Sequence, residues 1–316
     1  MTTSPDLAAP PDSGGLPNLR PSSPRYGEKI IFGILAGSAV ISVATTVAIV
    51  LSLIMPSLDF FRDVSIVEFL TGTEWSAGFQ DAQYGVLALL SGTIQVVFYS
   101  LLVSIPVGLG VAIYLNEYAP DWVRRAVTPV LEILAGVPTV AIGLWALYAL
   151  TPIVADLLPF LEWGTYSIGV AGLAVGLMSV PIVSSVSQDA LRAVPDSLRQ
   201  GAFALGSTKR EVSIKIAVPA AFSGIVASII LAASRAVGET MIVLMAGGGR
   251  PQFTFDPTEP VLAMTSFIGQ TATGDIAAGT TTYDTIFAVG LLLFTITLIL
   301  NMLAIRMVRR FREVYE

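Results

Sequence analysis

QGAFALGSTKREVSIKIAVP, residues 200–219, carries the clearest local signals in the chain. Thr208 is followed three residues later by Glu211, which is the spacing of a capping box. In that motif a hydroxyl and a carboxylate satisfy the first free amides of a helix. Ser197 and Gln200 repeat the spacing just upstream, with a glycine between the two pairs. The pattern predicts two short helices that meet at a glycine turn.

The turn at Gly206 should gather apolar side chains on one side of this helix-turn-helix. These side chains are Leu198, Ala202, Phe203 and Leu205. Basic residues flank them, and a long apolar run opens near Pro219. A short helical element of this form is typical of docking into a groove on a cytoplasmic partner.

Long apolar runs lie on both sides of this loop. Hydrophobic residues make up 54% of the 316 residues and charged residues only 13%, and the mean hydropathy is +0.76. Backbone groups in lipid must be bonded within their own segment or in a closed barrel, and runs without period-2 alternation favour helices. The sequence therefore predicts an all-α integral membrane protein whose six spans cover residues 30–55, 86–115, 133–155, 166–188, 217–246 and 285–305.

The distribution of basic residues predicts the topology. Of the 17 Lys and Arg residues, Arg62 and Arg250 fall on one side of the membrane, Arg235 falls inside a span, and all others fall on the opposite side. Positive charge marks the cytoplasmic side, so both termini should be cytoplasmic. We expect a disordered cytoplasmic tail over 1–25, a membrane domain over 26–316, external loops at 56–85 and 247–284, and a cytoplasmic loop at 189–219.

Aromatic residues punctuate the first external loop. We interpret them as an interfacial belt with a short amphipathic helix over residues 64–70, rather than as a ligand site. A second short helix is expected in the later external loop, after its proline-rich turns.

Glycine and proline interrupt several spans. Pro106, Pro138 and Pro181 predict either plain kinks or breaks around a pathway, and both interpretations stay open. Small residues let helices approach closely, and the glycines expected to do so are Gly110, Gly136, Gly143, Gly169, Gly172 and Gly176.

Several functional classes are excluded by composition. The chain has no Cys and no His, which removes disulfides, thiolate metal sites and imidazole catalysis. It contains no Walker A motif, so any ATP hydrolysis must occur on another subunit. An intramembrane hydrolase is the weakest hypothesis, because no adjacent spans offer paired acid-base groups.

ASRAVGETM, residues 233–241, places charges inside the fifth predicted span. An Arg at the centre of a span costs about 2.5 to 3.5 kcal/mol on insertion scales and therefore faces the bundle interior or water. Glu239 lies one i,i+4 step from Arg235 on the expected helix face, so the two could simply neutralise each other. The alternative is that Arg235 binds an oxyanion through its fork of donors.

A carboxylate beside an anionic substrate is informative if that anion still carries a proton. Phosphate at neutral pH does, and sulfate does not, so Glu239 could accept the proton as a hydrogen bond. Ser234 and Thr240 could add hydroxyl contacts, although bonding back to a helix carbonyl is the commoner use. Glu132, near the start of the third predicted span, either favours the helix dipole or gates a pathway.

At this point the residues match a known pattern. QGAFALGSTKREVSIKIAVP resembles the EAA loop of ABC-importer permeases, with Ala202, Gly206, Ile216 and Pro219 in register. Gln200 replaces the usual Glu, so it can no longer offer a charge to an ATPase. The resemblance implies a type I ABC-importer permease fold in which Gln200, Ala202, Gly206, Ile216 and Pro219 couple to that ATPase.

The resemblance extends over about residues 60–310. GTIQVVFYSLLVSIPVGLGVAIYLNEYAP, LEILAGVPTVAIGLWAL and SRAVGETM are together similar to PstC-type permease subunits of bacterial phosphate importers. That family implies a heterodimer with a PstA-like permease, two copies of a cytoplasmic ATPase that uses ATP with magnesium, and an external phosphate-binding protein. It also implies residence in the bacterial plasma membrane, inorganic phosphate as substrate at Arg235, Glu239, Thr240 and Ser234, and no cofactor or nucleic acid bound by this chain. An importer of another oxyanion, and a channel or scaffold without an ATPase, remain alternatives.

Overall fold

The computed structural model describes residues 26–77, 81–277 and 279–311. The expected tail over 1–25 lies outside the described residues. Within them the chain is helical, and its only β pairing is an isolated bridge between Trp75 and Tyr84. Chain contacts divide the molecule at Ile49 into an N-terminal unit and a larger C-terminal unit.

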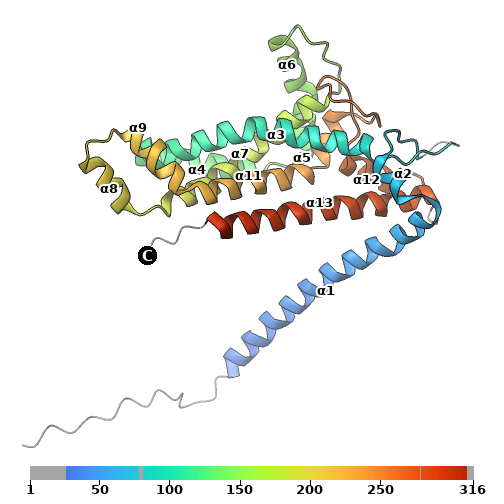
Figure 1. Cartoon of the computed structure of the whole chain (residues 1–316), viewed down its shortest axis with the longest axis horizontal. Coiled ribbons are helices and arrows are strands. Elements are labelled where there is room, and N and C mark those ends of the chain that lie inside the picture. The colour runs from blue at the N-terminus through green and yellow to red at the C-terminus, as the bar shows by residue number, and fades with distance from the viewer. Residues whose placement is uncertain (1–25, 78–80, 278, 312–316) are drawn as a thin grey trace, which may run out of the picture. The chain divides into compact units, whose positions relative to one another are not determined.

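The helices follow in chain order as labelled in Figure 1. They are α1 (Tyr26–Asp63), α2 (Ile66–Thr71), α3 (Leu87–Ile113), π-helical η1 (Tyr114–Tyr118), α4 (Asp121–Gly136), α5 (Thr139–Trp145), π-helical η2 (Ala146–Leu150), α6 (Thr151–Leu157), α7 (Ile168–Arg192), α8 (Asp196–Ala204), α9 (Lys209–Glu211), π-helical η3 (Val212–Ala217), α10 (Val218–Ala220), α11 (Phe222–Val237), π-helical η4 (Val243–Gly247), α12 (Met264–Thr273) and α13 (Thr281–Phe311).

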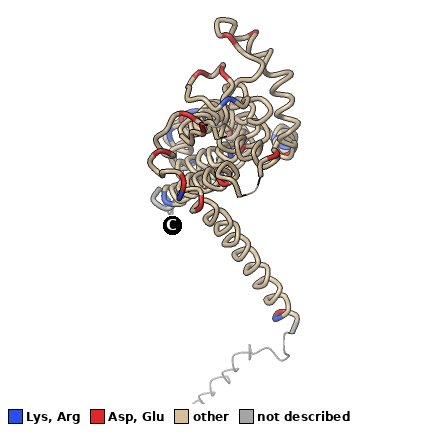
Figure 2. The backbone as a smooth tube through the Cα atoms, turned by 90° about the vertical axis from the view of Figure 1, so that its right-hand side faces the viewer, with Lys and Arg blue, Asp and Glu red and all other residues tan. Residues whose placement is uncertain are grey.

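The N-terminal unit contains the first part of α1. Its tube in Figure 2 carries no charge over most of its length. The hydroxyls of Ser38, Thr45 and Thr46 donate to the carbonyls four residues earlier at 2.8–3.0 Å. The helix therefore satisfies its own polar side chains, as a lipid environment requires.

The described residues contain five helical stretches long and apolar enough to cross a membrane, or six if one bent pair counts as a single span. This agrees with the six predicted spans, although their ends differ. The first span runs on through Pro56 to Asp63. Pro106 and Pro181 lie inside continuous helices, so of the three prolines singled out in the sequence only Pro138 lies at a break between helices.

The third span differs most from its prediction. Residues 121–136 form α4, an amphipathic helix with no buried residue, and the apolar span begins only at Thr139. Val137 and Pro138 are extended and separate the two elements. Proline disfavours helical conformation at the preceding residue, which explains why a single apolar run becomes two helices.

The central helix of the C-terminal unit is α7, and most of its residues are buried. Its glycines let other segments of the same chain pack closely against it. An added Cβ would lie 2.7 Å from the Ser100 carbonyl oxygen at Gly176 and 2.6 Å from the Tyr99 Cβ at Gly172. An added Cβ would be similarly crowded at Gly143 in α5 and at Gly169 in α7. At Gly110 in α3 and Gly136 in α4 it would have nothing within 4 Å. The expectation of close packing was therefore wrong for Gly110 and Gly136, because their helix faces are open.

The start of α7 is fixed by a loop that follows η4. The Ile168 and Gly169 amides donate to the Glu259 and Pro257 carbonyls at 3.0 and 2.9 Å. These bonds satisfy amides that a helix start leaves free. Asp256 in this loop accepts hydrogen bonds from the backbone and hydroxyl of Thr258, which lower the pKa of its carboxyl.

The aromatic residues of the first predicted external loop form a packed cluster. Phe60, Phe69 and Trp75 are buried, and their rings meet edge to face with centroids 5.6 and 6.4 Å apart. Trp75 also contacts Phe267 of α12 at 4.9 Å. The prediction of an interfacial belt was wrong for these three rings, because mutual packing removes them from the surface.

The short helices expected in the two loops are present. The first is α2, which begins two residues later than predicted, and the second is α12.

Candidate translocation pathway and coupling segment

The fifth predicted span is broken twice. The chain bends by 70° between the helical stretch ending at Ala220 and α11. Then α11 ends at Val237, and helix resumes at Met241 after an interruption over residues 238–240. One uninterrupted helix over 217–246 was therefore wrong.

Arg235 lies in the last turn of α11 and is partly buried. Its Nη2 lies 3.5 Å from the sulfur of Met178 on α7. Among the described residues, no ion pair involves Arg235. Its donors therefore face a soft, weak acceptor and keep most of their hydrogen-bonding capacity.

Glu239 does not pair with Arg235. The helix ends between them, so the i,i+4 relation and the self-neutralising ion pair expected from the sequence are both absent. Glu239 is 8% exposed, and its Oε1 accepts a hydrogen bond from the Ile242 amide at 3.4 Å. The carboxylate thus lies at the start of the next helical segment, where negative charge is favoured.

The break is supported by other hydrogen bonds. The hydroxyl of Thr265 on α12 donates to the Glu239 carbonyl at 2.8 Å. Thr240 donates to the Gly238 carbonyl at 3.4 Å, and Ser234 donates to Asn301 on α13 at 3.2 Å. Backbone groups freed inside a membrane need such partners. Arg235, Glu239 and Thr240 are therefore grouped at one helix break, while Ser234 points to α13.

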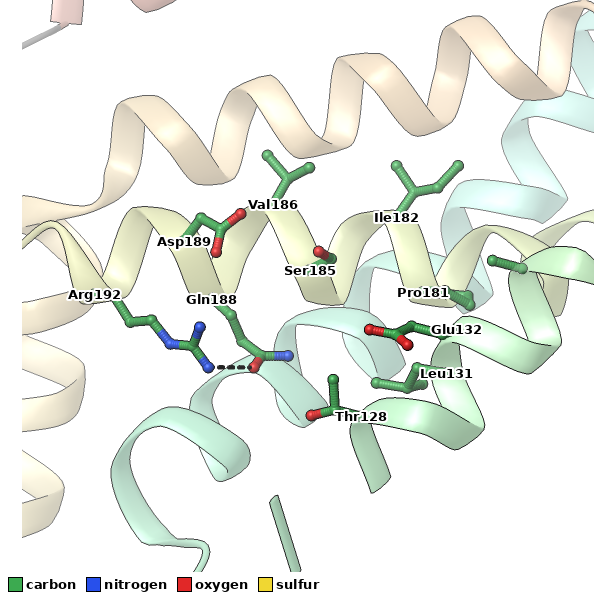
Figure 3. A pocket seen from close by; sticks show the side chains of 11 residues that line it. Thr128, Leu131, Glu132, Pro181, Ile182, Ser185, Val186, Gln188, Asp189 and Arg192 are labelled. Atoms are coloured by element: carbon green, nitrogen blue, oxygen red, sulfur yellow. Dashed lines mark hydrogen bonds between the residues drawn. The ribbon is translucent and has the colours of Figure 1, made fainter. Parts of the chain in front are cut away.

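A cavity of about 470 Å³ lies between α4 and α7 (Figure 3). Glu132 and Thr128 line it from α4, and Ser185, Asp189 and Arg192 line it from α7. Glu132 lies near the C-terminal end of α4, so its dipole interpretation was wrong.

Gln188 is the buried polar group at the α7 wall of this cavity. Its oxygen accepts from Arg192 at 3.5 Å, as the dashed line in Figure 3 shows. Its amide nitrogen donates to Ser184 at 3.1 Å. Both polar ends of the Gln188 side chain therefore have partners within α7.

The coupling segment, residues 189–219, turns at Gly206 as predicted. Gly206 has φ +83°. Its amide donates to Phe203 at 2.9 Å and the Ser207 amide donates to Ala202 at 3.1 Å, which together form a Schellman motif. The capping box of Thr208 and Glu211 is present.

The second predicted capping box is absent. Ser197 lies inside α8, because the helix already begins at Asp196 after the extended Pro195. Its hydroxyl is therefore not in the N-cap position that pairing with Gln200 requires.

The expected coupling residues occupy different environments. Gln200 and Pro219 are exposed, Ile216 is half-buried and Ala202 is buried. The apolar side chains Leu198, Phe203 and Leu205 remain exposed, with Leu205 at 89%. Ala202 faces inward and does not share that surface.

Side-chain contacts that the sequence analysis did not anticipate hold this segment in place. Arg199 of α8 forms a buried ion pair with Glu117 of η1. Outside this segment, the contacts of Met178 with Arg235 and of Asn301 with Ser234 were also not predicted. The residue types in the sequence gave no signal of these contacts, because each joins positions far apart in the chain.

Comparison with known proteins identifies the fold and its relatives. A sequence model of the family described as binding-protein-dependent transport system inner membrane component matches residues 104–313. The probable ABC transporter permease protein YqgH of Bacillus subtilis is 33% identical over 273 residues, covering 85% of this chain and 87% of that protein. The phosphate transport system permease protein PstC of Xylella fastidiosa is 32% identical and covers 77% and 79% of the two chains.

Solved transporter structures share the fold at low identity. A chain of a bacterial alginate ABC transporter, in complex with its alginate-bound periplasmic protein, superposes with a TM-score of 0.63 at 15% identity, covering 91% of this chain and 96% of that one. A chain of the inward-facing MetNI methionine ABC transporter gives a TM-score of 0.53 at 19% identity, covering 72% and 95%. The fold is that of type I ABC importer permeases.

Proposed function

We propose a function from one premise: the chain belongs to the family of inner membrane components of binding-protein-dependent transport systems. It is a multi-pass inner membrane protein and a transporter subunit. In our proposal it is the permease subunit of an ATP-driven importer of inorganic phosphate, and it forms the translocation pathway together with a PstA-like permease. The relatives named as phosphate transport permeases support this choice of substrate.

The observation that carries the proposal is the guanidinium of Arg235 at a helix break, which forms no ion pair with any residue that the structure describes. An Arg without an ion-pair partner inside a span is expensive, and it is retained where it faces a pathway or binds a ligand. Its fork of donors suits an oxyanion of phosphate geometry. Met178 lies against Arg235 without neutralising it, so the charge remains available.

Glu239 has two compatible roles in this proposal. Its carboxylate caps the helical segment that starts at Met241, which fixes the break beside Arg235. The second carboxylate oxygen could accept the proton that phosphate carries and sulfate lacks. Thr240, in the same break, supplies a hydroxyl, and Ser234 steadies α11 against α13.

Arg192 and the cavity beside α4 extend the proposed pathway toward the coupling segment. Met178, Ser185, Asp189 and Arg192 follow one another along α7 at steps of seven, four and three residues, which keeps them on one stripe of the helix. Ser185, Asp189 and Arg192 are exposed. A polar stripe on a membrane helix belongs at a water-filled path or at a partner helix.

Energy for transport is proposed to come from two copies of a separate ATPase that binds ATP with magnesium. The exposed Leu198, Phe203 and Leu205 offer an apolar surface for docking into that subunit. Closure of the ATPase pair would move α8, and the chain carries the motion through α10 into α11. Alternating access to Arg235 would follow, with an external phosphate-binding protein delivering the substrate.

Reconstitution of the complete transporter in liposomes tests the proposal. We expect ATP-dependent uptake of phosphate in competition assays, and a loss of at least ten-fold in uptake for Arg235→Gln. Arg62→Gln is the matched control, because Arg62 is exposed and pairs with Asp59 at 2.6 Å. Sulfate or molybdate displacing phosphate as the preferred substrate would contradict the phosphate assignment, and uptake without ATP would favour a channel.

A further inference from the structure

The end of the second span is tied to the coupling segment by a buried ion pair. Glu117 in η1 and Arg199 in α8 lie 82 positions apart in the chain, and an oxygen of Glu117 accepts from Arg199 Nη1. Their side chains are only 8% and 14% exposed. Salt and water screen such a pair much less than the surface pairs of this chain.

Arg199 binds a second element at the same time. Its Nη2 donates to the carbonyl of Leu191, at the end of α7, at 2.7 Å. One guanidinium therefore joins α8 to both η1 and α7. Its planar fork makes two such directed contacts possible, which a lysine at this position would not provide.

Two further contacts converge on η1. Lys209 of α9 lies over the ring of Tyr118, 5.2 Å from its centroid, and Arg124 of α4 donates to the Leu115 carbonyl at 3.0 Å. η1 continues α3 without a break, since the helical stretch runs from Leu87 to Tyr118. A displacement of α8 or α9 would therefore act directly on the end of a membrane span.

We propose that the pair of Glu117 and Arg199 is a mechanical link that carries motion of the coupling segment into α3. The covalent route through α10 reaches only α11, whereas this link moves the second span in the same step. Both residues are positioning residues, because neither touches the proposed substrate site at Arg235. The inference rests on the proposed coupling to an ATPase and goes beyond it by naming a second route.

Uptake and hydrolysis measured on the same proteoliposomes test the link. In the complete transporter, Glu117→Gln and Arg199→Gln should each lower phosphate uptake at least ten-fold while ATP hydrolysis falls less than three-fold. Phosphate moved per ATP then drops. Lys215→Gln is the control. It removes an exposed ion pair of the same segment, in which Lys215 Nζ lies 3.1 Å from Glu211 Oε1, and it should leave the number of phosphates moved per ATP unchanged.

Covalent rescue separates a link from a merely structural contact. The chain has no cysteine, so Glu117→Cys combined with Arg199→Cys can be joined by a short bis-methanethiosulfonate reagent when the other subunits are also cysteine-free. We expect cross-linking to restore the number of phosphates moved per ATP, and reduction of the disulfide cross-link to lower it again. Equal loss of uptake and hydrolysis in both single variants, or no rescue by the cross-link, would overturn the inference.

A readout without substrate distinguishes this inference from the proposed function. Spin labels at Leu102→Cys on α3 and Leu298→Cys on α13, both exposed positions, should change their separation when ATP and vanadate are added. Glu117→Gln should abolish that change. If Glu117→Gln abolishes the distance change but the native transporter imports no phosphate, the link is supported and the phosphate assignment is refuted. If the distance change persists in Glu117→Gln and the native transporter imports phosphate, the link is refuted.

Discussion

Gly206 shows how much one backbone angle contributes to the coupling segment. Its φ of +83° lies in the left-handed region, and an added Cβ would meet nothing within 4 Å. Gly206→Ala should therefore destabilise the turn by about 1 to 2 kcal/mol through backbone strain alone. Thermal unfolding of the purified protein and co-purification with the ATPase measure the effect.

Gly201 provides the matched control for that substitution. It lies inside α8, also with nothing within 4 Å of an added Cβ. Gly201→Ala should be neutral or stabilise the helix by about 0.5 to 1 kcal/mol. Equal effects at the two positions would mean that the strain at Gly206 does not limit the turn.

Glu239 permits a substitution that removes charge without removing the cap. The side-chain oxygen of Glu239→Gln can still accept the Ile242 amide, which the native Oε1 accepts at 3.4 Å. We expect the preference for phosphate over sulfate to fall at least ten-fold, about 1.4 kcal/mol, because the proton of phosphate loses its acceptor. Competitive uptake in proteoliposomes measures it.

Glu239→Ala separates the two roles, since it removes the cap as well. It should also lower the unfolding temperature, in line with a loss of about 1 kcal/mol for a missing helix cap. An unchanged preference in Glu239→Gln would refute the role of Glu239 in recognising the proton.

At the residue scale, only some local motifs were predicted correctly: the second capping box and the i,i+4 pair of Arg235 and Glu239 failed because the helix boundaries differ. Long-range contacts were not predicted at all. The capping box at Thr208 and the turn at Gly206 were predicted correctly, because their partners lie within a few residues. Met178 beside Arg235 and Glu117 beside Arg199 were missed, because each pair joins distant helices. The pathway roles of Arg235, Glu239, Thr240 and Ser234 remain predictions.

The contact between α3 and α7 depends on glycine at the element scale. An added Cβ at Gly176 would lie 2.7 Å from the Ser100 carbonyl oxygen, which is backbone and cannot rotate away. Gly176→Ala should separate the two helices locally and cost about 1 to 3 kcal/mol, the range for overpacking a well-filled core. Thermal unfolding in detergent detects the loss.

Gly110→Ala is the control on the facing helix. Gly110 lies in α3 with nothing within 4 Å of an added Cβ, so the change should be neutral or slightly stabilising. A similar loss of stability in both variants would show that helix propensity, and not packing between α3 and α7, decides the outcome.

Hydropathy predicted that spans exist but not where they break. The apolar run over 217–246 has no proline near Gly238. The interruption is supported by local hydrogen bonds of Glu239 and Thr240 and by one from Thr265 of α12, which forms only in the folded bundle. The apolar run over 133–155 hid the end of an amphipathic helix, because α4 ends in Leu134, Ala135 and Gly136 before Pro138. Window averages cannot resolve such boundaries.

The C-terminal unit is polarised along its spans. In the C-terminal unit, α8 and α9 lie at the same end as the C-terminal end of α13 (Figure 1). Arg199, Lys209, Arg210, Arg306, Arg309 and Arg310 lie in these segments. Because positive charge marks the cytoplasmic side, this end is predicted to be cytoplasmic. The orientation of the chain in the membrane is thus predicted from the positions of its basic residues and not from contacts within the subunit.

Single-cysteine labelling tests that orientation without a background, since the native chain has no cysteine. Ser197→Cys in α8 and Thr280→Cys before α13 are both exposed positions. The reagent is a membrane-impermeant maleimide, added to cells whose outer envelope is permeabilised and whose inner membrane is sealed. It should label Thr280→Cys at once and Ser197→Cys only after the inner membrane is permeabilised. The reverse pattern would place the coupling segment outside, where no ATPase could reach Leu205, and would refute both the orientation and the proposed coupling.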